Sequence, residues 1–173
     1  KYMPKSYQFN NKQLINLKDI DYRYKYILKP ENEWSRGGIN IIQNYNDIDE
    51  WIKKNYQYQN WVLQKYVINP LLIDKKKFHF RIYILIVKRP SKIKLETYLF
   101  KEYFALCAPI NYNYKSKDLT CHLTGAKYCN VHLVTNKLME ENDINFHKIL
   151  PQFYEIAKDC GNISQKYIKP LYS

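Results

Sequence analysis

The sequence lacks the glycine patterns that hold phosphates in the two commonest nucleotide-binding folds. It has four glycines among 173 residues, and neither GxxxxGK[ST] nor GxGxxG occurs. Both motifs place glycine where backbone N–H groups must approach phosphate oxygens closely. The mononucleotide-binding P-loop fold and the dinucleotide-binding Rossmann fold therefore lose support.

Long apolar runs and paired cysteines are missing too. The block Ile82 to Val87 has the length of a strand and is closed by Lys88-Arg89-Pro90, so no segment is long enough to span a bilayer. The four cysteines form neither a CxxC pair nor a zinc-finger spacing, and no secretory signal precedes them. We expect a soluble protein with reduced thiols in the cytosol and no membrane partner.

Acidic residues are outnumbered. The chain has 16 Asp and Glu against 28 Lys and Arg, a formal net charge of +12, so a large partner is expected to be polyanionic. Nucleic acid, an anionic membrane and acidic protein tails all meet that condition. Lys, Asn, Tyr and Ile are so abundant that a biased genome could also supply much of the lysine excess without selection for binding.

The pattern along the chain predicts one folded domain. Residues 1–24 are polar and rich in tyrosine without a clear period, so we expect a weakly ordered leader or the remnant of a preceding domain, followed by the folded domain at 25–173. Alternating and apolar blocks predict strands, and apolar residues at helical spacing predict helices. The class expected is α+β or α/β, with a mostly antiparallel sheet flanked by helices. Strands are expected at 26–28, 38–42, 61–67, 78–87 and within 95–107, and helices from Asn46 or Asp47 to 54 and from 143 to 159, the latter interrupted or kinked near Pro151 and stopped by Gly161.

Cationic residues inside apolar segments are the anomaly in this pattern. Lys29, Lys65, Lys77 and Arg81 each lie within or beside a predicted strand. Burying an uncompensated ammonium is costly, so such groups either point to solvent or face an anion. Residues two or four apart on a strand share a face, which places Lys77, His79 and Arg81 together. That row suits a triphosphate or an acyl phosphate, with an exposed basic strand face as the alternative.

The loop after Lys29 has the composition of a flexible phosphate cover. It carries Arg36, Gly37 and Gly38, and adjacent glycines let backbone amides approach phosphate oxygens. This loop by itself does not identify a nucleotide site.

Six short pieces in order carry a resemblance to a known family. They cover roughly Tyr26 to Lys169 and are similar to the central and downstream part of the tubulin tyrosine ligase family, whose fold is ATP-grasp. The Thr-Cys-His-Leu-Thr string resembles the tyrosine ligase itself more than the glutamylating and glycylating branches. The six pieces are Tyr26-Ile-Leu-Lys29-Pro30, Ser35-Arg-Gly-Gly-Ile39, Val62-Leu-Gln-Lys-Tyr-Val67, Pro70-Leu-Leu-Ile73, Lys77-Phe-His-Phe-Arg81 and Thr120-Cys-His-Leu-Thr124.

The resemblance implies roles for particular residues around ATP. Lys29 would reach the phosphates, while Lys77 and Arg81 would hold the γ-phosphate and the acyl phosphate formed from the acceptor carboxylate. The implied reaction is ATP-dependent activation of a carboxylate followed by attack of an amino acid's amine, and Arg81 and Lys77 are its expected catalytic residues. The remaining expected nucleotide contacts are the loop residues Arg36, Gly37 and Gly38, the hinge Gln64, Lys65, Tyr66 and Val67, whose backbone would read adenine, and His122, Leu123 and Thr124 beside the ribose and phosphates.

The chain departs from the family pattern at several positions. The family's Phe-Asp-x-Arg is Phe78-His79-Phe80-Arg81 here, Leu106 stands where relatives often have arginine, and Gly125 replaces an expected asparagine. The family binds magnesium through an acidic residue and a Glu-x-Asn motif on late strands, whereas only Leu-Tyr-Ser follows Pro170. The Mg2+ ligands are therefore expected outside this chain, which would be either a fragment or a degenerate copy.

The function expected is an ATP-dependent ligase that adds tyrosine or glutamate to tubulin. The alternative is a non-catalytic, degenerate relative that binds microtubules structurally, and a weaker third reading is a basic nucleic-acid-binding domain. The expected location is the cytoplasm, on microtubules of the cytoskeleton, with cilia as one such place. The expected partners are nucleotide and the acidic tails of tubulin.

Overall fold

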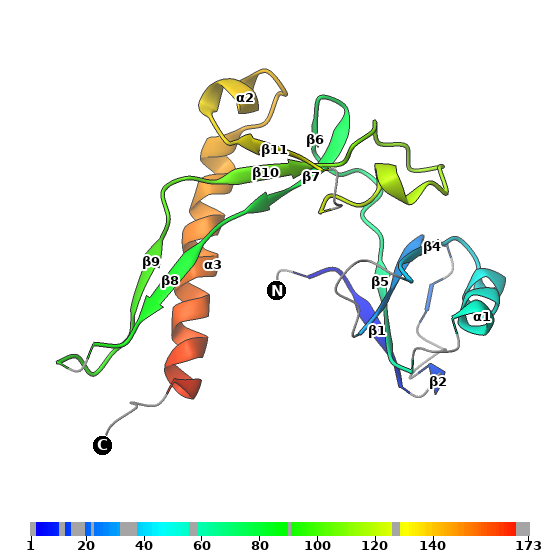
Figure 1. The fold of residues 1–173 in the computed structure, drawn as a ribbon, viewed down its shortest axis with the longest axis horizontal. Coiled ribbons are helices and arrows are strands. Elements are labelled where there is room, and N and C mark those ends of the chain that lie inside the picture. The colour runs from blue at the N-terminus through cyan, green and yellow to red at the C-terminus, as the bar shows by residue number, and fades with distance from the viewer. Residues whose placement is uncertain are drawn as a thin grey trace.

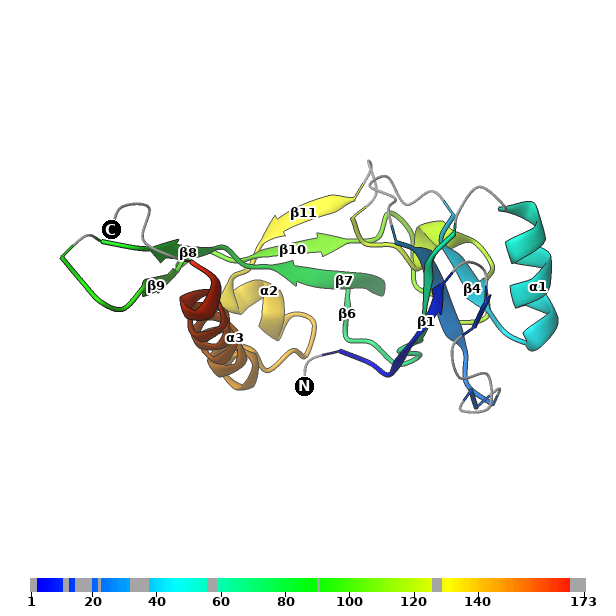
Figure 2. The ribbon, with the colours of Figure 1, turned by 90° about the horizontal axis from the view of Figure 1, so that it is seen from below.

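The computed structural model describes residues 3–10, 13–14, 20–21, 23–31, 38–55, 59–89, 91–125 and 129–168. It contains two main sheets, with α1 beside the first and α3 beside the second at opposite ends of the molecule (Figures 1 and 2). Every strand pairing described is antiparallel. The predicted α+β class with antiparallel sheets is confirmed.

The first sheet has the strand order β2-β1-β5-β3-β4. The buried side chains of one face, including Leu28 and Leu63, form a core with Ile48 and Trp51 of α1. The helix therefore covers that face and leaves the other face of the sheet to the rest of the molecule. Its elements are β1 (Ser6–Asn10), β2 (Gln13–Leu14), β3 (Tyr26–Pro30), β4 (Asn40–Ile42), β5 (Trp61–Lys65) and α1 (Tyr45–Lys54).

The second sheet has the strand order β11-β10-β7-β6, and β8 and β9 form a separate two-stranded sheet beside α3 (Figure 1). Phe78 and Phe80 of β7 pack into a second core against residues such as Ile73 and Phe146. The elements are β6 (Leu72–Ile73), β7 (Lys76–Arg81), β8 (Ile84–Val87), β9 (Glu96–Leu99), β10 (Phe104–Cys107), β11 (Asn130–Leu133), α2 (Asn136–Glu140), α3 (Phe146–Tyr167) and a 3₁₀ turn at Leu119–Cys121.

Two predictions about the N-terminal half need correction. Residues 6–10 lie in the segment for which weak order was predicted, yet they form β1 and pair with β5 in the register Tyr7 to Leu63. The cap of α1 is Asn44 rather than Asn46 or Asp47. Asn44 accepts a hydrogen bond from the backbone of Asp47, and the Asp47 carboxylate accepts one in return from the backbone of Asn44. This reciprocal capping box fixes the start of the helix.

The C-terminal half contains three further differences. The apolar block 78–87 is not one strand, because β7 ends at Arg81 and β8 begins at Ile84 in a different sheet. The last helix continues through Pro151 to Tyr167, so it is not interrupted there. Gly161 does not stop it: the residue is buried inside the helix against Thr97, where a Cβ would lie 2.1 Å from the threonine Oγ1. Strand β11 and helix α2 were not predicted.

No helix in the described part of the chain combines the length and apolar character needed to cross a membrane.

Candidate functional site

The face of the first sheet that points away from α1, called the inner face below, carries Lys29, the first cation predicted for the site. In β3 and β5, Leu28 and Leu63 point into the α1 core, so Lys29 and Gln64 lie on the opposite face. Lys29 Nζ donates a hydrogen bond of 2.9 Å to Gln64 Oε1. Burial lowers the pKa of Lys29 below its ordinary value, because an ammonium loses hydration there. Two residues predicted for the site are thus brought together.

The second cation comes from β7. Phe78 and Phe80 occupy the core face, which leaves Lys77, His79 and Arg81 on the other face as predicted. Lys77 Nζ donates a 3.0 Å hydrogen bond to the hydroxyl of Tyr66 and lies 4.4 Å from the centre of its ring. The pKa of Lys77 is lowered to about 8, first by burial and then by the positive charge of Lys29. The two ammonium groups, from different sheets, are therefore close enough to repel.

Both lysines have neutral partners. Neither Lys29 nor Lys77 forms an ion pair with a carboxylate in the part of the chain that the structure describes. Two half-buried ammonium groups that share a region without a counter-ion favour an anionic ligand, because its charge would offset both the lost hydration and the repulsion.

His122 is connected to Lys77 through the hydroxyl of Tyr66, and its side chain is buried. Only 2% of its surface is exposed, Nδ1 is 2.7 Å from the Tyr66 hydroxyl, and Nε2 is 2.9 Å from the carbonyl oxygen of Ser116. A carbonyl can only accept, so Nε2 carries the proton, and the neutral ring accepts at Nδ1 from Tyr66. Burial lowers the pKa of His122, and Lys77 lowers it further, which keeps the ring neutral.

These bonds form one directed chain. Lys77 donates to the oxygen of Tyr66, Tyr66 donates to His122, and His122 donates to Ser116. Both ring nitrogens of His122 are thereby occupied by protein atoms. Its expected place beside the ribose and phosphates stays a prediction, and the geometry gives it the part of orienting Tyr66.

An apolar cluster holds the loop between β10 and β11 against the first sheet. Ile27, Ile41 and Tyr66 are buried together on the inner face of the first sheet. Leu123, predicted to line the nucleotide site, packs against this cluster with its side chain, as do Ile39, Tyr112 and Leu119. The loop that contains the Thr-Cys-His-Leu-Thr string is therefore held against β3, β4 and the residue after β5.

The remaining β7 residues differ in their surroundings. His79 Nδ1 is 2.7 Å from Thr124 Oγ1, which joins two positions of the resemblance. Arg81 is exposed, and it makes no ion pair with any residue that the structure describes. Its position on the same strand face as Lys77 agrees with the prediction, while its expected catalytic role stays a prediction.

The loop and the hinge are only partly described. Gly38 has φ 72°, a conformation that favours glycine, whereas Arg36 and Gly37 lie outside the described residues. A cavity of about 600 Å³ adjoins the hinge residues Lys65, Tyr66 and Val67, but its lining does not include Lys29 or Lys77. Val67 is exposed.

Sequence reasoning missed the side chain of Tyr66 and the part of Ser116. Tyr66 was expected to act through its backbone, yet its hydroxyl connects Lys77 to His122. Burial raises the pKa of Tyr66 above its ordinary value, so the group stays a neutral phenol. A tyrosine in the middle of a hinge motif gives no signal of a partner 56 positions away in the chain.

The chain is similar to one protein family and to several known proteins. The model of the tubulin-tyrosine ligase family matches residues 2–169. Tubulin glycylase 3B of Drosophila melanogaster is 39% identical over 84 residues, 45% of this chain and 11% of the relative. A human tubulin polyglutamylase is 34% identical over 102 residues, 58% of this chain and 14% of the relative. A probable tubulin–tyrosine ligase of Schizosaccharomyces pombe is 28% identical over 125 residues, 66% of this chain and 30% of the relative.

The chain thus spans less than a third of the length of each of these three relatives.

Proposed function

Because this chain belongs to the tubulin-tyrosine ligase family, we propose that it is the nucleotide-binding part of an ATP-dependent ligase that joins an amino acid to tubulin. The proposed fold is ATP-grasp, in which two sheets hold the nucleotide between them. The names of the relatives divide among glycylase, polyglutamylase and tyrosine ligase. The proposal therefore stops at an amino acid and does not choose one.

One observation carries the proposal. Lys29 and Lys77 come from different sheets, both are half-buried, and the pKa of each is lowered by burial, with the charge of Lys29 acting on Lys77. A triphosphate between the sheets would relieve this repulsion and would favour the charged form of both ammonium groups. Catalysis of phosphoryl transfer rests chiefly on positioning and charge stabilisation, which these cations supply.

The roles proposed for the other residues follow from their placement. Arg81, further along the Lys77 face of β7, would meet the acyl phosphate, and the hinge backbone from Gln64 to Val67 would read adenine. Gly38, with Arg36 and Gly37 before it, would belong to the loop that covers the phosphates. Tyr66 would hold the Lys77 ammonium in place, and His122 would hold Tyr66. ATP, when bound, supplies the phosphoryl group that activates the acceptor carboxylate.

Unlike ATP, the Mg2+ ion that the family uses has no candidate ligand group among the described residues. The described residues contain no group of three His, Cys, Asp or Glu side chains able to hold a metal ion. The proposal therefore routes no step through magnesium and assigns no metal ligand.

Calorimetry with ATP, ADP and AMP tests the proposal. Affinity should fall in that order, and Lys29→Gln should weaken ATP binding by at least tenfold, because one charge-assisted phosphate contact is lost. Lys148→Gln, which removes an exposed charge from α3, is the matched control and should bind as the parent does. Equal affinity for ATP and AMP, or equal losses in the two variants, would contradict a phosphate site at Lys29.

The second candidate function is a non-catalytic family member that binds microtubules. It is favoured by His79, which stands where the family pattern has an acid and which is within hydrogen-bond distance of Thr124. Co-sedimentation separates the two candidates. Binding to microtubules without any saturable ATP binding would favour the structural role, whereas ATP binding that depends on Lys29 and Lys77 favours the ligase.

A further inference from the structure

The β8–β9 hairpin projects at the end of the molecule opposite α1 (Figures 1 and 2). One face of the hairpin is covered by α3, because Thr97 of β9 packs against Gly161 of that helix. The next residue, Tyr98, points to the other face, and its cross-strand partner Leu85 lies on that face with it. This second face, called the outward face below, is the one that points away from α3.

The outward face is apolar and aromatic. The pairing of the two strands continues beyond their ends, since the backbone N–H of Phe100 donates to the carbonyl oxygen of Tyr83. The side chains of these two residues therefore join Leu85 and Tyr98 on one surface. All four are between 45% and 62% exposed, and they line a hollow of about 630 Å³. A contiguous exposed apolar face is typical of an interaction surface.

The loop at the tip of the hairpin is basic and carries an exposed isoleucine. Ile93 is 90% exposed, and Lys88 Nζ donates to the carbonyl oxygens of Lys92 and Ile93 at 2.8 and 2.7 Å, which ties the loop together. Lys94 lines a cleft against α3 with Lys158, and the described lining of that cleft contains no acidic side chain. The cations of the loop are Lys88, Arg89, Lys92 and Lys94.

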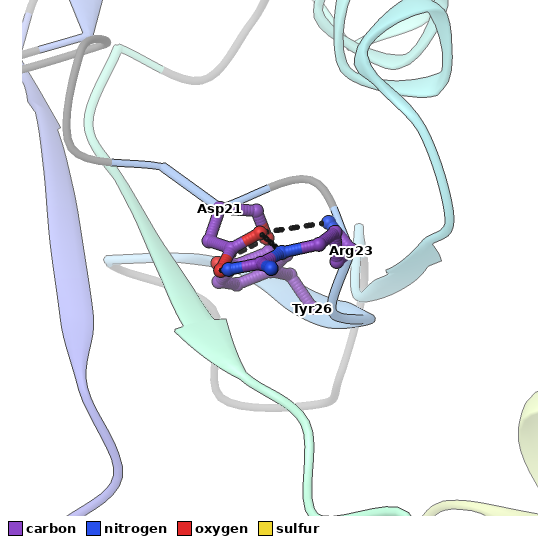
Figure 3. Close-up of polar contacts among 3 residues, drawn as sticks. All are labelled: Asp21, Arg23 and Tyr26. Atoms are coloured by element: carbon purple, nitrogen blue, oxygen red, sulfur yellow. Dashed lines mark hydrogen bonds and ion pairs between the residues drawn. The ribbon is translucent and has the colours of Figure 1, made fainter.

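The loop and the strand residue that follows it contain a single carboxylate, Glu96. It forms ion pairs with Arg89 and Lys92, and hydrogen bonds from Lys92 and Arg89 lower its pKa, so it stays ionised. Elsewhere on the surface an exposed guanidinium has a carboxylate of its own, because Arg23 donates to both side-chain oxygens of Asp21 (Figure 3). The tip of the hairpin thus carries positive charge in excess.

An anionic membrane surface is the partner that uses both features of the hairpin. Apolar and tyrosine side chains partition into the headgroup region of a bilayer, while neighbouring cations are attracted by anionic lipids. A soluble polyanion would use the cations and leave the aliphatic side chains of Leu85 and Ile93 in water. A single-stranded nucleic acid would likewise gain no base stacking from those two side chains.

We propose that the β8–β9 hairpin docks on an anionic phospholipid membrane, with Ile93 and the outward face entering the headgroup region and the loop cations meeting lipid phosphates. This surface contains none of the residues proposed for the nucleotide site, and it does not depend on the ligase reaction. The prediction of no membrane partner rested on the lack of a spanning segment, and docking on a membrane surface requires none.

Co-sedimentation with vesicles tests the proposal. The full 173-residue chain is mixed with vesicles of equal parts phosphatidylcholine and phosphatidylserine, with phosphatidylcholine alone as the neutral control. Affinity for the anionic vesicles should fall about 25-fold in Lys92→Gln with Lys94→Gln, at about fivefold for each charge. Ile93→Ser should lose about tenfold, because its side chain no longer leaves water. Leu85→Ser should lose affinity too, and it keeps the test decisive if the lysine variant disturbs the loop.

The matched control variants lie on other elements. Lys54→Gln with Lys148→Gln removes the same charge from exposed positions of α1 and α3, and Val131→Ser removes a side chain of β11 that is 59% exposed. Both controls should bind the anionic vesicles within about twofold of the parent, because their charges and apolar atoms lie off the docking surface. Equal losses in the hairpin and control variants would mean that net charge alone attracts the chain, and would overturn the proposal.

Three other results would also overturn the membrane site. Equal affinity for the neutral vesicles would remove the charge argument. Hexaglutamate or hexathymidylate bound as tightly, with the same loss in Ile93→Ser, would make the hairpin a surface for soluble polyanions. A dimer in light scattering that Leu85→Ser turns into a monomer would mean that a second copy covers the outward face. ATP affinity is measured in parallel, so a failed nucleotide site and a failed membrane site give different patterns.

Discussion

Replacing Lys77 by methionine should make the unliganded protein more stable at neutral pH. The pKa of this half-buried lysine is about 8 in the folded chain instead of 10.5, so folding disfavours the charged form of the ammonium. At roughly 1.36 kcal/mol per pH unit, the difference corresponds to about 3 kcal/mol. Methionine keeps the length of the side chain and removes the charge, at the cost of one hydrogen bond to Tyr66 worth about 1 kcal/mol. The net gain below pH 8 is about 2 kcal/mol.

The gain should depend on pH in a defined window. Below pH 8 the parent carries a proton on Lys77 in both the folded and the unfolded chain, so the full cost of burying the charge is present. Between pH 8 and 10.5 the unfolded chain binds more protons than the folded one, and the free energy of unfolding of the parent rises with pH. Above pH 10.5 both states are neutral there, and the methionine variant should be less stable by about the lost hydrogen bond.

Urea unfolding at several pH values measures this difference, with Lys148→Met on the exposed face of α3 as the control. Titration of the many tyrosines affects parent and variants alike, so it cancels in the comparison. ATP binding by Lys77→Met should be at least tenfold weaker, so stability and binding move in opposite directions. The reasoning is refuted if Lys77→Met is destabilised at pH 7, or if its difference from the parent is constant from pH 7 to 10.5.

Three further substitutions test single contacts by urea unfolding. Tyr66→Phe leaves the buried imidazole without its donor and should cost about 1–3 kcal/mol, and no loss would show that the bond is not formed. Gly161→Ala places a methyl group against Thr97 and should destabilise by about 1–3 kcal/mol; Thr97→Ala should restore part of it, and the absence of rescue would argue against that contact. Asn44→Ala removes the cap of α1 and should cost about 1 kcal/mol, whereas Asn46→Ala should be nearly neutral, and the reverse order would move the cap.

The fold was predicted best where local pattern decides it. Two strands were predicted correctly, at Tyr26–Pro30 and Trp61–Lys65. In both, an apolar block closed by a proline or a polar residue marks a strand in the local sequence. Ser6–Asn10 was missed because its stability comes from pairing with a strand more than 50 residues away, which no local period records. Gly161 was misread as a stop because glycine ends many helices, and only the packed structure reveals that Thr97 needs the space.

The site was predicted in its charges more than in its connections. The period of two on β7 correctly placed Lys77 and Arg81 on one face, since strand geometry alone fixes that relation. The approach of Lys77 to Lys29 depends on how the two sheets sit against each other, and it could only be suspected from the ordered pieces of the resemblance. The contact of Tyr66 with His122 depends on a loop that folds back over the first sheet, and spacing holds no trace of it.

An acid at position 79 provides the sharpest test of the shared face on β7. Two residues apart on a strand, an aspartate there would lie roughly 7 Å from Lys77, and at an effective dielectric constant of about 20 their attraction is about 2 kcal/mol. His79→Asp should therefore raise the pKa of Lys77 by one to two pH units and narrow the pH window over which stability rises.

The matched variant His79→Asn places a side chain with the shape of aspartate but without its charge at position 79. The pH window over which its stability rises should therefore be the same as in the parent. ATP affinity without metal should fall in His79→Asp, because the carboxylate repels phosphate and offsets the lysine. If the two variants titrate identically in urea unfolding, position 79 does not share an environment with Lys77, and the charge argument for the nucleotide site loses its basis.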